Sequence, residues 1–313
     1  MLFALSYSAA AAQQSGKMFR IGYLDPSTAS GSAVFLDAFR QELAKLGWIE
    51  GKNIAIERRF SEGKSERVSE LAAELVRLGV DLIVVTGTPT ALAAKKATTT
   101  IPVVMTNVGD PVSAGLIASL ARPGGNVTGL SSLSPELITK RLEILRDAVP
   151  NLDRIGVLRP GRTGQIQLKE LRSAAGALKL KLEEIETQAN GLESAFQTAK
   201  KKQVKAIMTT VTPSFFGERR RIVELAGKYK LPAIYPQDEF VEAGGLMSYG
   251  ADYDDLYRRA ANYVDKILKG AKPADLPVQQ ATKFEFIINL KAAKQIGLTI
   301  PVRVLERANR VIR

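Results

Sequence analysis

An alternation of predicted strands and helices constrains the fold of this chain more than any other feature of its sequence. In the first half, residues 18–25, 53–60, 81–85 and 102–106 are predicted strands. Apolar residues at helical spacing predict helices at 34–46, 65–78, 90–97 and 112–120. The strand DLIVV at 81–85 is apolar throughout, which is typical of a parallel sheet covered on both faces.

The alternation begins again in the second half, where RIGVL at 154–158 echoes RIGYL at 20–24. Strands are predicted at 181–186, 206–211 and 232–236, and helices at 166–178, 192–202, 217–229, 237–243 and 256–268. Two such series predict an α/β fold with two doubly wound, Rossmann-like parallel-sheet lobes. Ligands of such sheets bind beyond the carboxyl ends of the strands, near the switch in strand order, so we expect a site between the lobes.

The composition limits the chemistry, because the 313 residues include no cysteine and no histidine. Disulfides, thiolate metal sites, cysteine nucleophiles and Ser-His relays are excluded. We therefore predict a protein that is not an enzyme and that uses no cofactor and no metal. The alternative is an enzyme on the same scaffold, with Asp25, Asp110 or Asp238 as a carboxylate base.

The net charge of +12 makes nucleic acid a partner to consider. Aromatic residues make up only 6% of the chain, and no stacking motif interleaves with its basic clusters. A ligand-sensing regulatory protein is a further alternative, but residues 1–17 are too few for a helix-turn-helix before the first strand. We predict no nucleic-acid partner.

The N-terminal stretch MLFALSYSAAAAQQSGKM resembles the end of a secretory signal, with a short apolar run before small residues. A cut after Ala12 fits this pattern. The basic start of a signal is missing, so we expect the natural start to be truncated. A disordered tail at residues 1–17 is the alternative. No other apolar run reaches the length of a membrane span.

Five loops follow predicted strands and hold hydroxyls, glycines and small polar groups: 25–28, 86–89, 107–111, 159–164 and 209–214. From these loops and the nearby strands, the predicted ligand contacts are Ser27, Thr28, Thr86, Gly87, Thr88, Asn107, Asp110, Arg159, Thr210, Thr212, Tyr235, Asp238 and Tyr249.

The stretch Thr86-Gly87-Thr88-Pro89 has neither the spaced glycines nor the lysine of a phosphate loop, so a nucleotide is disfavoured. It fits a helix start, with a hydroxyl cap at Thr88 and a proline at the first helical position. Free N–H groups there would hold a carboxylate. Thr88 could instead do no more than cap its helix, and the same alternative applies to Asp110.

Three residues of the second half could complete the site. Asp238 follows a strand and could pair with a ligand ammonium, although helix capping explains it equally well. Tyr235 and Tyr249 could wall an aromatic or apolar ligand group, and core packing is the alternative for both.

The chain resembles the TrpX-like substrate-binding proteins of ABC transporters, which have the type I periplasmic binding protein fold. The resembling stretches include ELAKLGWIEGKNIAIERRFSEG at 42–63, TGTPTALAAKKATTTIPVV at 86–104 and GGLMSYGADY at 244–253. The resemblance implies a hinged pair of lobes that close on a small ligand. It implies a periplasmic receptor, here with a signal peptide, that delivers an amino acid, often aromatic, to a permease in the inner membrane. We expect a monomer.

The resemblance also implies three crossings between the lobes, expected at 126–129, 246–249 and 277–281. Lobe one would comprise 18–128 and 248–279, and lobe two 129–247 and 280–313. One departure is the loop LRPGRTGQ at 158–165, where we expect Asn-Pro in the family. Its arginines, Arg159 and Arg162, make an acid-rich ligand more plausible unless they point to solvent.

Overall fold

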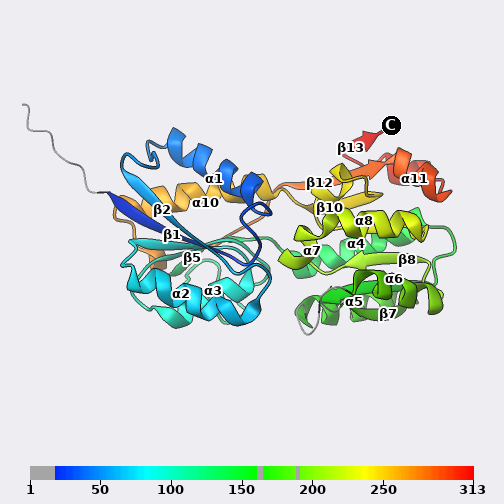
Figure 1. The fold of residues 1–313 in the computed structure, drawn as a ribbon, viewed down its shortest axis with the longest axis horizontal. Coiled ribbons are helices and arrows are strands. Elements are labelled where there is room, and N and C mark those ends of the chain that lie inside the picture. The colour runs from blue at the N-terminus through cyan, green and yellow to red at the C-terminus, as the bar shows by residue number, and fades with distance from the viewer. Residues whose placement is uncertain (1–17, 161–164, 188–190) are drawn as a thin grey trace, which may run out of the picture.

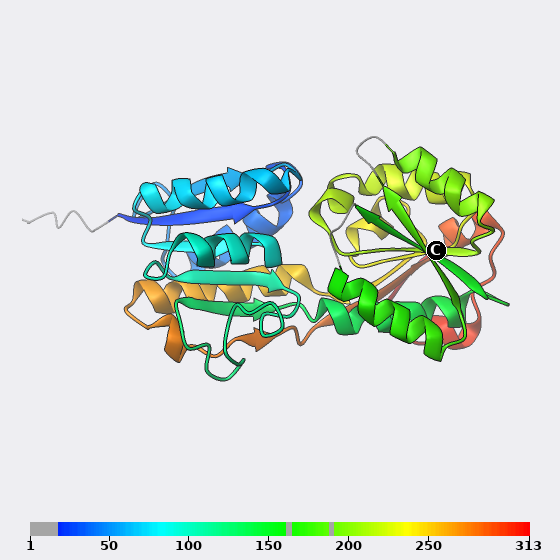
Figure 2. The same ribbon diagram turned by 90° about the horizontal axis from the view of Figure 1, so that it is seen from below.

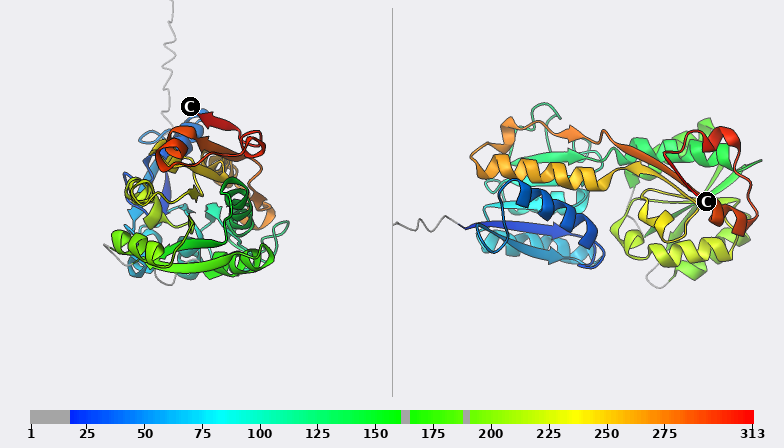
Figure 3. Two further views of the ribbon diagram at one scale, coloured as in Figure 1. Left: turned by 90° about the vertical axis from the view of Figure 1, so that its right-hand side faces the viewer. Right: turned by 90° about the horizontal axis from the view of Figure 1, so that it is seen from above.

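The computed structural model describes residues 18–160, 165–187 and 191–313 of the chain. They form two lobes, each built on its own sheet, which lie side by side along the longest axis of the molecule (Figure 1). The same division into two bodies is plain from below (Figure 2) and from above (Figure 3). The predicted fold class, two α/β lobes with parallel sheets, is confirmed.

The first lobe begins with the N-terminal series of strands and helices. In chain order these are β1 (Phe19–Asp25), α1 (Ala33–Lys45), β2 (Ile54–Phe60), the 3-10 turn η1 (Ser65–Arg67), α2 (Val68–Arg77), β3 (Leu82–Val85), α3 (Thr88–Ala97), β4 (Val103–Val108) and β5 (Val127–Ser131). The chain returns to this lobe with α10 (Tyr253–Leu268), η2 (Pro273–Asp275) and β11 (Gln279–Gln280).

The sheet of this lobe has the strand order β11-β5-β4-β3-β1-β2, and all its pairs are parallel. Helices α1 and α10 lie together on one face, and α2 and α3 lie on the other (Figure 1). Both faces are thus covered, and every residue of β3 is buried, as its apolar sequence predicts.

The second lobe holds the remaining elements. They are α4 (Ser134–Ala148), β6 (Arg154–Pro160), α5 (Gln165–Ala177), β7 (Lys181–Thr187), α6 (Leu192–Lys201), β8 (Ala206–Thr209), α7 (Pro213–Gly217), α8 (Arg219–Lys228), β9 (Ala233–Tyr235), α9 (Glu239–Glu242), β10 (Met247–Ala251), β12 (Phe284–Asn289), α11 (Leu290–Ile296), α12 (Val302–Leu305) and β13 (Arg310–Ile312). The strand order is β13-β12-β10-β9-β8-β6-β7, and only the β10–β12 pair is antiparallel among the described strands.

The chain changes sheet three times, a few residues after each expected crossing. β5 pairs in the first sheet as far as Ser131, and α4 of the second lobe begins at Ser134. β10 stays in the second sheet to Ala251, and β11 stays in the first sheet to Gln280. The predicted lobe bounds at 128, 247 and 279 therefore stay a prediction. The chain leaves each sheet a few residues after these positions.

One predicted helix is absent from the structure. Residues 112–120 form turns rather than a helix, because Gly115 has a φ of +69°, which a right-handed helix does not allow. The helix predicted at 217–229 is confirmed as α8, and a separate short helix, α7, which Thr212 caps, precedes it. Helix α4 was not predicted at all.

Candidate ligand site between the two lobes

Each sheet has one switch in strand order, and eight of the thirteen predicted site residues lie at these two switches. β1 lies between β2 and β3, and β6 lies between β7 and β8. The loops after β1 and β3 hold Ser27, Thr28 and Thr86–Thr88, while the end of β6 and the loop after β8 hold Arg159, Thr210 and Thr212. Crevices at such switch points bind ligands in open α/β sheets.

The two switch points face one another across the lobes. Phe35 lies in α1, which follows β1, and Phe216 lies in α7, which follows β8. Their ring centroids are 5.4 Å apart. Because each helix begins beyond the carboxyl end of its strand, this contact brings the two carboxyl edges together, at the centre of the molecule in Figure 2.

Asp25 fixes the loop at the first switch point. It ends β1 with only 1% of its surface exposed. The backbone N–H of Ser27 donates to its Oδ1 at 2.7 Å, and the Tyr23 hydroxyl donates to its Oδ2 at 3.0 Å. Burial raises the pKa of Asp25, and hydrogen bonds from Ser27, Tyr23 and Thr86 act against that rise. The carboxylate is therefore occupied by groups of its own lobe.

The loop after β3 is tied to the helix that returns from the second lobe. The hydroxyl oxygens of Thr86 and Tyr257, in α10, are 3.1 Å apart. The Thr90 hydroxyl donates to the carbonyl oxygen of Thr86 at 2.7 Å. Burial raises the pKa of Tyr257, so its hydroxyl keeps its proton at neutral pH. The sequence places Tyr257 in the helix predicted at 256–268 but does not mark it as a neighbour of the predicted site.

The start of α3 corrects one prediction. Thr88 is the first helical residue rather than the cap, and no described side chain caps the helix. Gly87 precedes it with a φ of +81°, a conformation that glycine adopts without strain, so the turn needs no hydroxyl. The N–H groups of the first helical turn have no partner within a helix, and this one therefore offers them to an anion.

Asn107 and Asp110 are engaged within the first lobe. The Thr106 hydroxyl donates to the Asn107 side-chain oxygen at 3.3 Å. Asp110 Oδ1 accepts from the backbone N–H groups of Val112 and Ser113 at 3.1 and 3.0 Å. Burial raises the pKa of Asp110, but the hydrogen bonds from Ser113 and Val112 outweigh burial, and the pKa is lowered overall. Asp110 caps a turn, not the helix predicted there.

At the second switch point, Arg159 is paired. Its guanidinium lies 3.4 Å from Glu184 and 3.2 Å from Glu186, both on the neighbouring strand β7. Arg159 therefore forms ion pairs within its own lobe instead of pointing only to solvent. Arg162 lies outside the described residues.

The two threonines after β8 also have partners. The Thr210 hydroxyl donates to the carbonyl of Leu158 at 3.5 Å, and it is fully buried. Thr212 Oγ1 accepts from the N–H of Phe215 at 3.4 Å and caps α7. Thr212 thus has a structural role that the sequence did not assign.

A cavity of about 280 Å³ lies between the lobes, and of the predicted site residues Asp238 alone is among those that line it. Phe35 and Arg258 line it from the first lobe, and Gln237 and Asp238 from the second. The side chain of Asp238 does not cap α9, which corrects the capping alternative. The acidic residues that line the cavity are Asp238, Glu239, Glu242, Asp252, Asp254 and Glu285, of which Glu239 keeps its proton at neutral pH because burial and Asp238 raise its pKa to about 9. With one arginine against them, the cavity suits a ligand ammonium.

An aromatic cluster borders this cavity. The Phe35 ring stacks on Tyr257 at 5.1 Å and lies 5.8 Å from Tyr253. With Phe216 these rings connect α1, α10 and α7. The sequence pattern identified Phe35 only as a core residue of its helix, because nothing local marks a helix position as facing another lobe.

Tyr235 and Tyr249 lie elsewhere. Tyr235 stacks on Phe240 at 4.7 Å inside the second lobe. The ring of Tyr249 meets Phe286 edge-on at 6.3 Å, and its carbonyl accepts from Arg141 at 3.1 Å. Neither lines the interlobe cavity, so their contact with a ligand stays a prediction.

Neither a metal-site arrangement nor a membrane-spanning helix is found in the part of the chain that the structure describes. No cluster of three or more acidic side chains there has the arrangement of a metal site. No helix in the same part of the chain combines the length and apolarity needed to cross a membrane.

Comparison with known proteins adds the family. The profile of the family described as ABC transporter substrate binding protein matches residues 30–312. A tyrosine-binding protein of Clostridioides difficile strain R20291 is 30% identical over 264 residues, which cover 83% of this chain and 75% of that protein.

Two solved structures are similar along nearly the whole chain. A conserved domain protein of Vibrio cholerae has a TM-score of 0.86 and 32% identity, covering 94% of this chain and 100% of its own. The ABC domain of Streptococcus pneumoniae in complex with L-Trp has a TM-score of 0.85 and 30% identity, covering 95% and 100%.

A third structure shows a different degree of similarity. It is the ligand-free, open structure of a substrate binding protein with adhesive properties from Clostridium difficile. The TM-score is 0.66 at 26% identity, with 94% of this chain and 99% of that chain covered.

Proposed function

The chain belongs to the family of ABC transporter substrate-binding proteins, and from this premise we propose that it binds an amino acid with an aromatic side chain between its lobes. A tyrosine-binding protein and a tryptophan complex among the similar proteins support this ligand class. Substrate-binding proteins of ABC importers work outside the cytoplasm and hand their ligand to a membrane permease.

One observation carries the proposal: an open helix start and an aromatic cluster are joined at a single interlobe surface. Thr86 contacts Tyr257, Tyr257 stacks on Phe35, and Phe35 contacts Phe216 of the other lobe. We assign the ligand carboxylate to the N–H groups of Gly87 and Thr88, with the nearby hydroxyls adding contacts. The ligand ring would lie against the aromatic cluster.

The ammonium group is assigned to the acidic cavity, with Asp238 as the first partner. Ser27, Thr28 and Asn107 would add contacts from the first lobe, and Thr210 from the second. Because Arg159 already pairs with two glutamates, we favour a ligand with a single carboxylate over an acid-rich one. No histidine or cysteine is present for catalysis, and we propose a receptor rather than an enzyme.

Calorimetric titration tests the ligand class with six compounds. We expect L-tryptophan, L-tyrosine or L-phenylalanine to bind, and L-leucine to bind more weakly because it offers no ring. Tryptamine lacks the carboxylate and indole-3-propionate lacks the ammonium, so both should bind at least about 10-fold more weakly than L-tryptophan. Equal affinity for L-leucine, or no binding of any aromatic amino acid, would contradict the proposal.

The location and assembly are proposals from the same premise. We place the protein in the periplasm, exported by the signal-like stretch at residues 1–17, as a monomer that meets an inner-membrane permease. N-terminal sequencing of the exported protein tests the first point, since a signal peptide would be absent from it. Light scattering during size-exclusion chromatography tests the second against the 33.9 kDa chain mass.

A further inference from the structure

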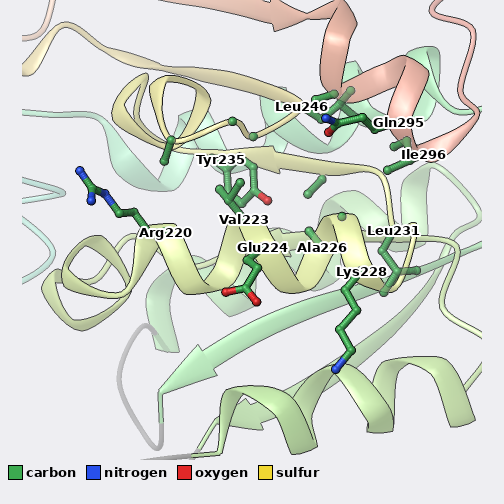
Figure 4. Close-up of a pocket in the computed structure, with 16 residues that line it drawn as sticks. Arg220, Val223, Glu224, Ala226, Lys228, Leu231, Tyr235, Leu246, Gln295 and Ile296 are labelled. Atoms are coloured by element: carbon green, nitrogen blue, oxygen red, sulfur yellow. The ribbon is translucent and has the colours of Figure 1, made fainter.

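A second cavity, of about 370 Å³, lies wholly within the second lobe. Helix α8, the segment between α9 and β10, and helix α11 surround it (Figure 4). Its apolar walls include Val223, Ala226, Leu231, Leu246, Ala292 and Ile296. None of the residues that line it also lines the interlobe cavity, so the two are separate.

Tyr235 is the buried polar side chain of this cavity, whereas the other polar residues that line it are exposed. Its side chain is 1% exposed, and one face of its ring stacks on Phe240. A Cβ at position 245 would lie 2.7 Å from the ring, so Gly245 makes room for it. The buried hydroxyl has no hydrogen-bond partner among the described residues. In Figure 4 it is directed toward the side where Ala226 lies, away from Arg220.

Two further hydroxyls lie on the same face of the sheet. Ser248 of β10 pairs with Tyr235 of β9, so their side chains share a face. Thr209 ends β8, the neighbour of β9 on the other side. The hydroxyls of Ser248 and Thr209 are also buried without a partner among the described residues. Buried hydroxyls in proteins are almost always hydrogen-bonded, so this part of the lobe has unused capacity for a polar atom.

Two of the three charged residues at the rim are paired, and the third, Arg220, is exposed and extends away from the other lining residues in Figure 4. Lys228 lies 2.6 Å from Glu193, and Glu224 lies 2.7 Å from Arg221. Because Lys228 and Glu224 are paired within α6 and α8 and the buried wall is apolar apart from Tyr235, the cavity favours an uncharged molecule over an ion.

We propose that this cavity binds a small uncharged molecule with an apolar body and one hydrogen-bond-accepting oxygen, such as a ketone. The Tyr235 hydroxyl donates to that oxygen, and the apolar walls bury the rest. The site is distinct from the one for the transported ligand, since it lies behind β9 rather than between the lobes. Such pockets, mostly apolar with one placed polar group, are typical of small-molecule sites.

Ligand-observed NMR with acetophenone and isopropylbenzene tests this site on the full chain. The two probes have nearly the same shape, but only acetophenone has an accepting oxygen. We expect acetophenone to bind the wild type roughly 2- to 10-fold more tightly than isopropylbenzene. Tyr235→Phe keeps the ring and removes the hydroxyl, so this preference should vanish. Ala226→Leu fills the cavity and should abolish binding of both probes.

Tyr229→Phe is the matched control. Its hydroxyl donates to Glu193 at 2.8 Å outside the cavity, so its loss should leave probe binding unchanged. Equal affinity of the two probes for the wild type, or no binding of acetophenone, overturns the proposal. Displacement of acetophenone by L-tryptophan also overturns it, because it would place the probe between the lobes. Failure of L-tryptophan to bind would bear only on the proposed function.

Discussion

Thr88 is the first residue of α3, and its hydroxyl and N–H both lie at the helix start assigned to the ligand carboxylate. Thr88→Val removes the hydroxyl at nearly constant volume and leaves the backbone in place. A hydrogen bond to a charged group contributes about 1.5–3 kcal/mol, so we expect the Kd of L-tryptophan to rise at least about 10-fold. Calorimetric titration measures this change.

Thr100→Val is the control for that substitution. Thr100 is an exposed threonine just beyond the other end of α3, so its replacement should leave the Kd unchanged. Unchanged affinity in Thr88→Val would remove the Thr88 hydroxyl from the site and leave the carboxylate to backbone groups alone.

Glu239 gives a pH dependence at the residue scale. Burial raises the pKa of its carboxyl in the folded protein, and the neighbouring Asp238 adds to that rise. The folded state then keeps a proton that the unfolded state releases above about pH 4.3. The free energy of unfolding therefore falls as pH rises from that value toward the raised pKa. Glu239→Gln removes this titration, so its Tm should exceed that of the wild type at about pH 8 and match it at about pH 4.

Thermal unfolding followed by circular dichroism across this pH range measures the effect. Glu242→Gln is the control, since Glu242 lies exposed on the same short helix and its replacement should shift the Tm little at either pH. A Tm difference for Glu239→Gln that is the same at both pH values would show that the carboxyl titrates alike in the folded and unfolded chain.

At the scale of elements, Gly129 limits how β4 and β5 pair. Its φ is +126°, and a Cβ there would lie 2.2 Å from the carbonyl oxygen of Met105. Gly129→Ala must therefore separate the two strands or change the backbone. We expect the free energy of unfolding to fall by at least about 3 kcal/mol, measured by urea denaturation.

Gly176→Ala is the opposite case. Gly176 lies near the end of α5, with open space where a Cβ would be. Because alanine favours a helix, the free energy of unfolding should rise by up to about 1 kcal/mol. If both substitutions destabilise alike, the close approach of β5 to β4 is not the cause in Gly129→Ala.

Helices and strands with a clear apolar pattern could be predicted from the sequence, because the side chains that they bury set that pattern. The apolar run at 82–85 is a covered parallel strand as expected. The apolar pattern gives a wrong prediction where the backbone conformation of one residue prevents the helix. Residues 112–120 have helical spacing, but the positive φ of Gly115 turns the chain instead. Helix α4 shows that a helix next to a crossing can be passed over.

The candidate site could be predicted only in part. Loops at the carboxyl ends of strands follow from the strand order, and they led to Thr86–Thr88 and Asp238. Tyr257 and Phe216 could not be predicted, because the contact of Tyr257 with Thr86 spans 171 positions of sequence. Such a contact depends on how α10 returns to the first lobe, which no local pattern encodes.

At the scale of the whole molecule, the relation between the lobes bears on ligand binding. The TM-score is 0.85 against the tryptophan complex and 0.66 against the ligand-free, open structure. This difference supports an arrangement of lobes here that is close to the liganded one. The contact between Phe35 and Phe216 joins the lobes in that arrangement.

Phe216→Ala removes this contact from the second lobe. An aromatic pair contributes about 0.5–1.5 kcal/mol beyond its buried area, so the closed arrangement loses roughly 2- to 10-fold in population. Apparent affinity falls with the fraction of protein that is competent to bind. We therefore expect the Kd of L-tryptophan to rise roughly 2- to 10-fold, with a larger radius of gyration of the free protein in small-angle X-ray scattering. Saturating ligand should restore the wild-type radius, because closure buries the ligand against both lobes.

Phe196→Leu separates closure from stability. Phe196 is fully buried in the second lobe, where its ring stacks on that of Tyr229 at 5.9 Å. Both rings belong to the second lobe. Its replacement should lower the Tm without changing the radius or the Kd. A radius that stays constant in Phe216→Ala while the Kd rises would mean that Phe216 contacts the ligand directly and does not hold the lobes together. Constant values of both would remove the aromatic contact from the closing mechanism.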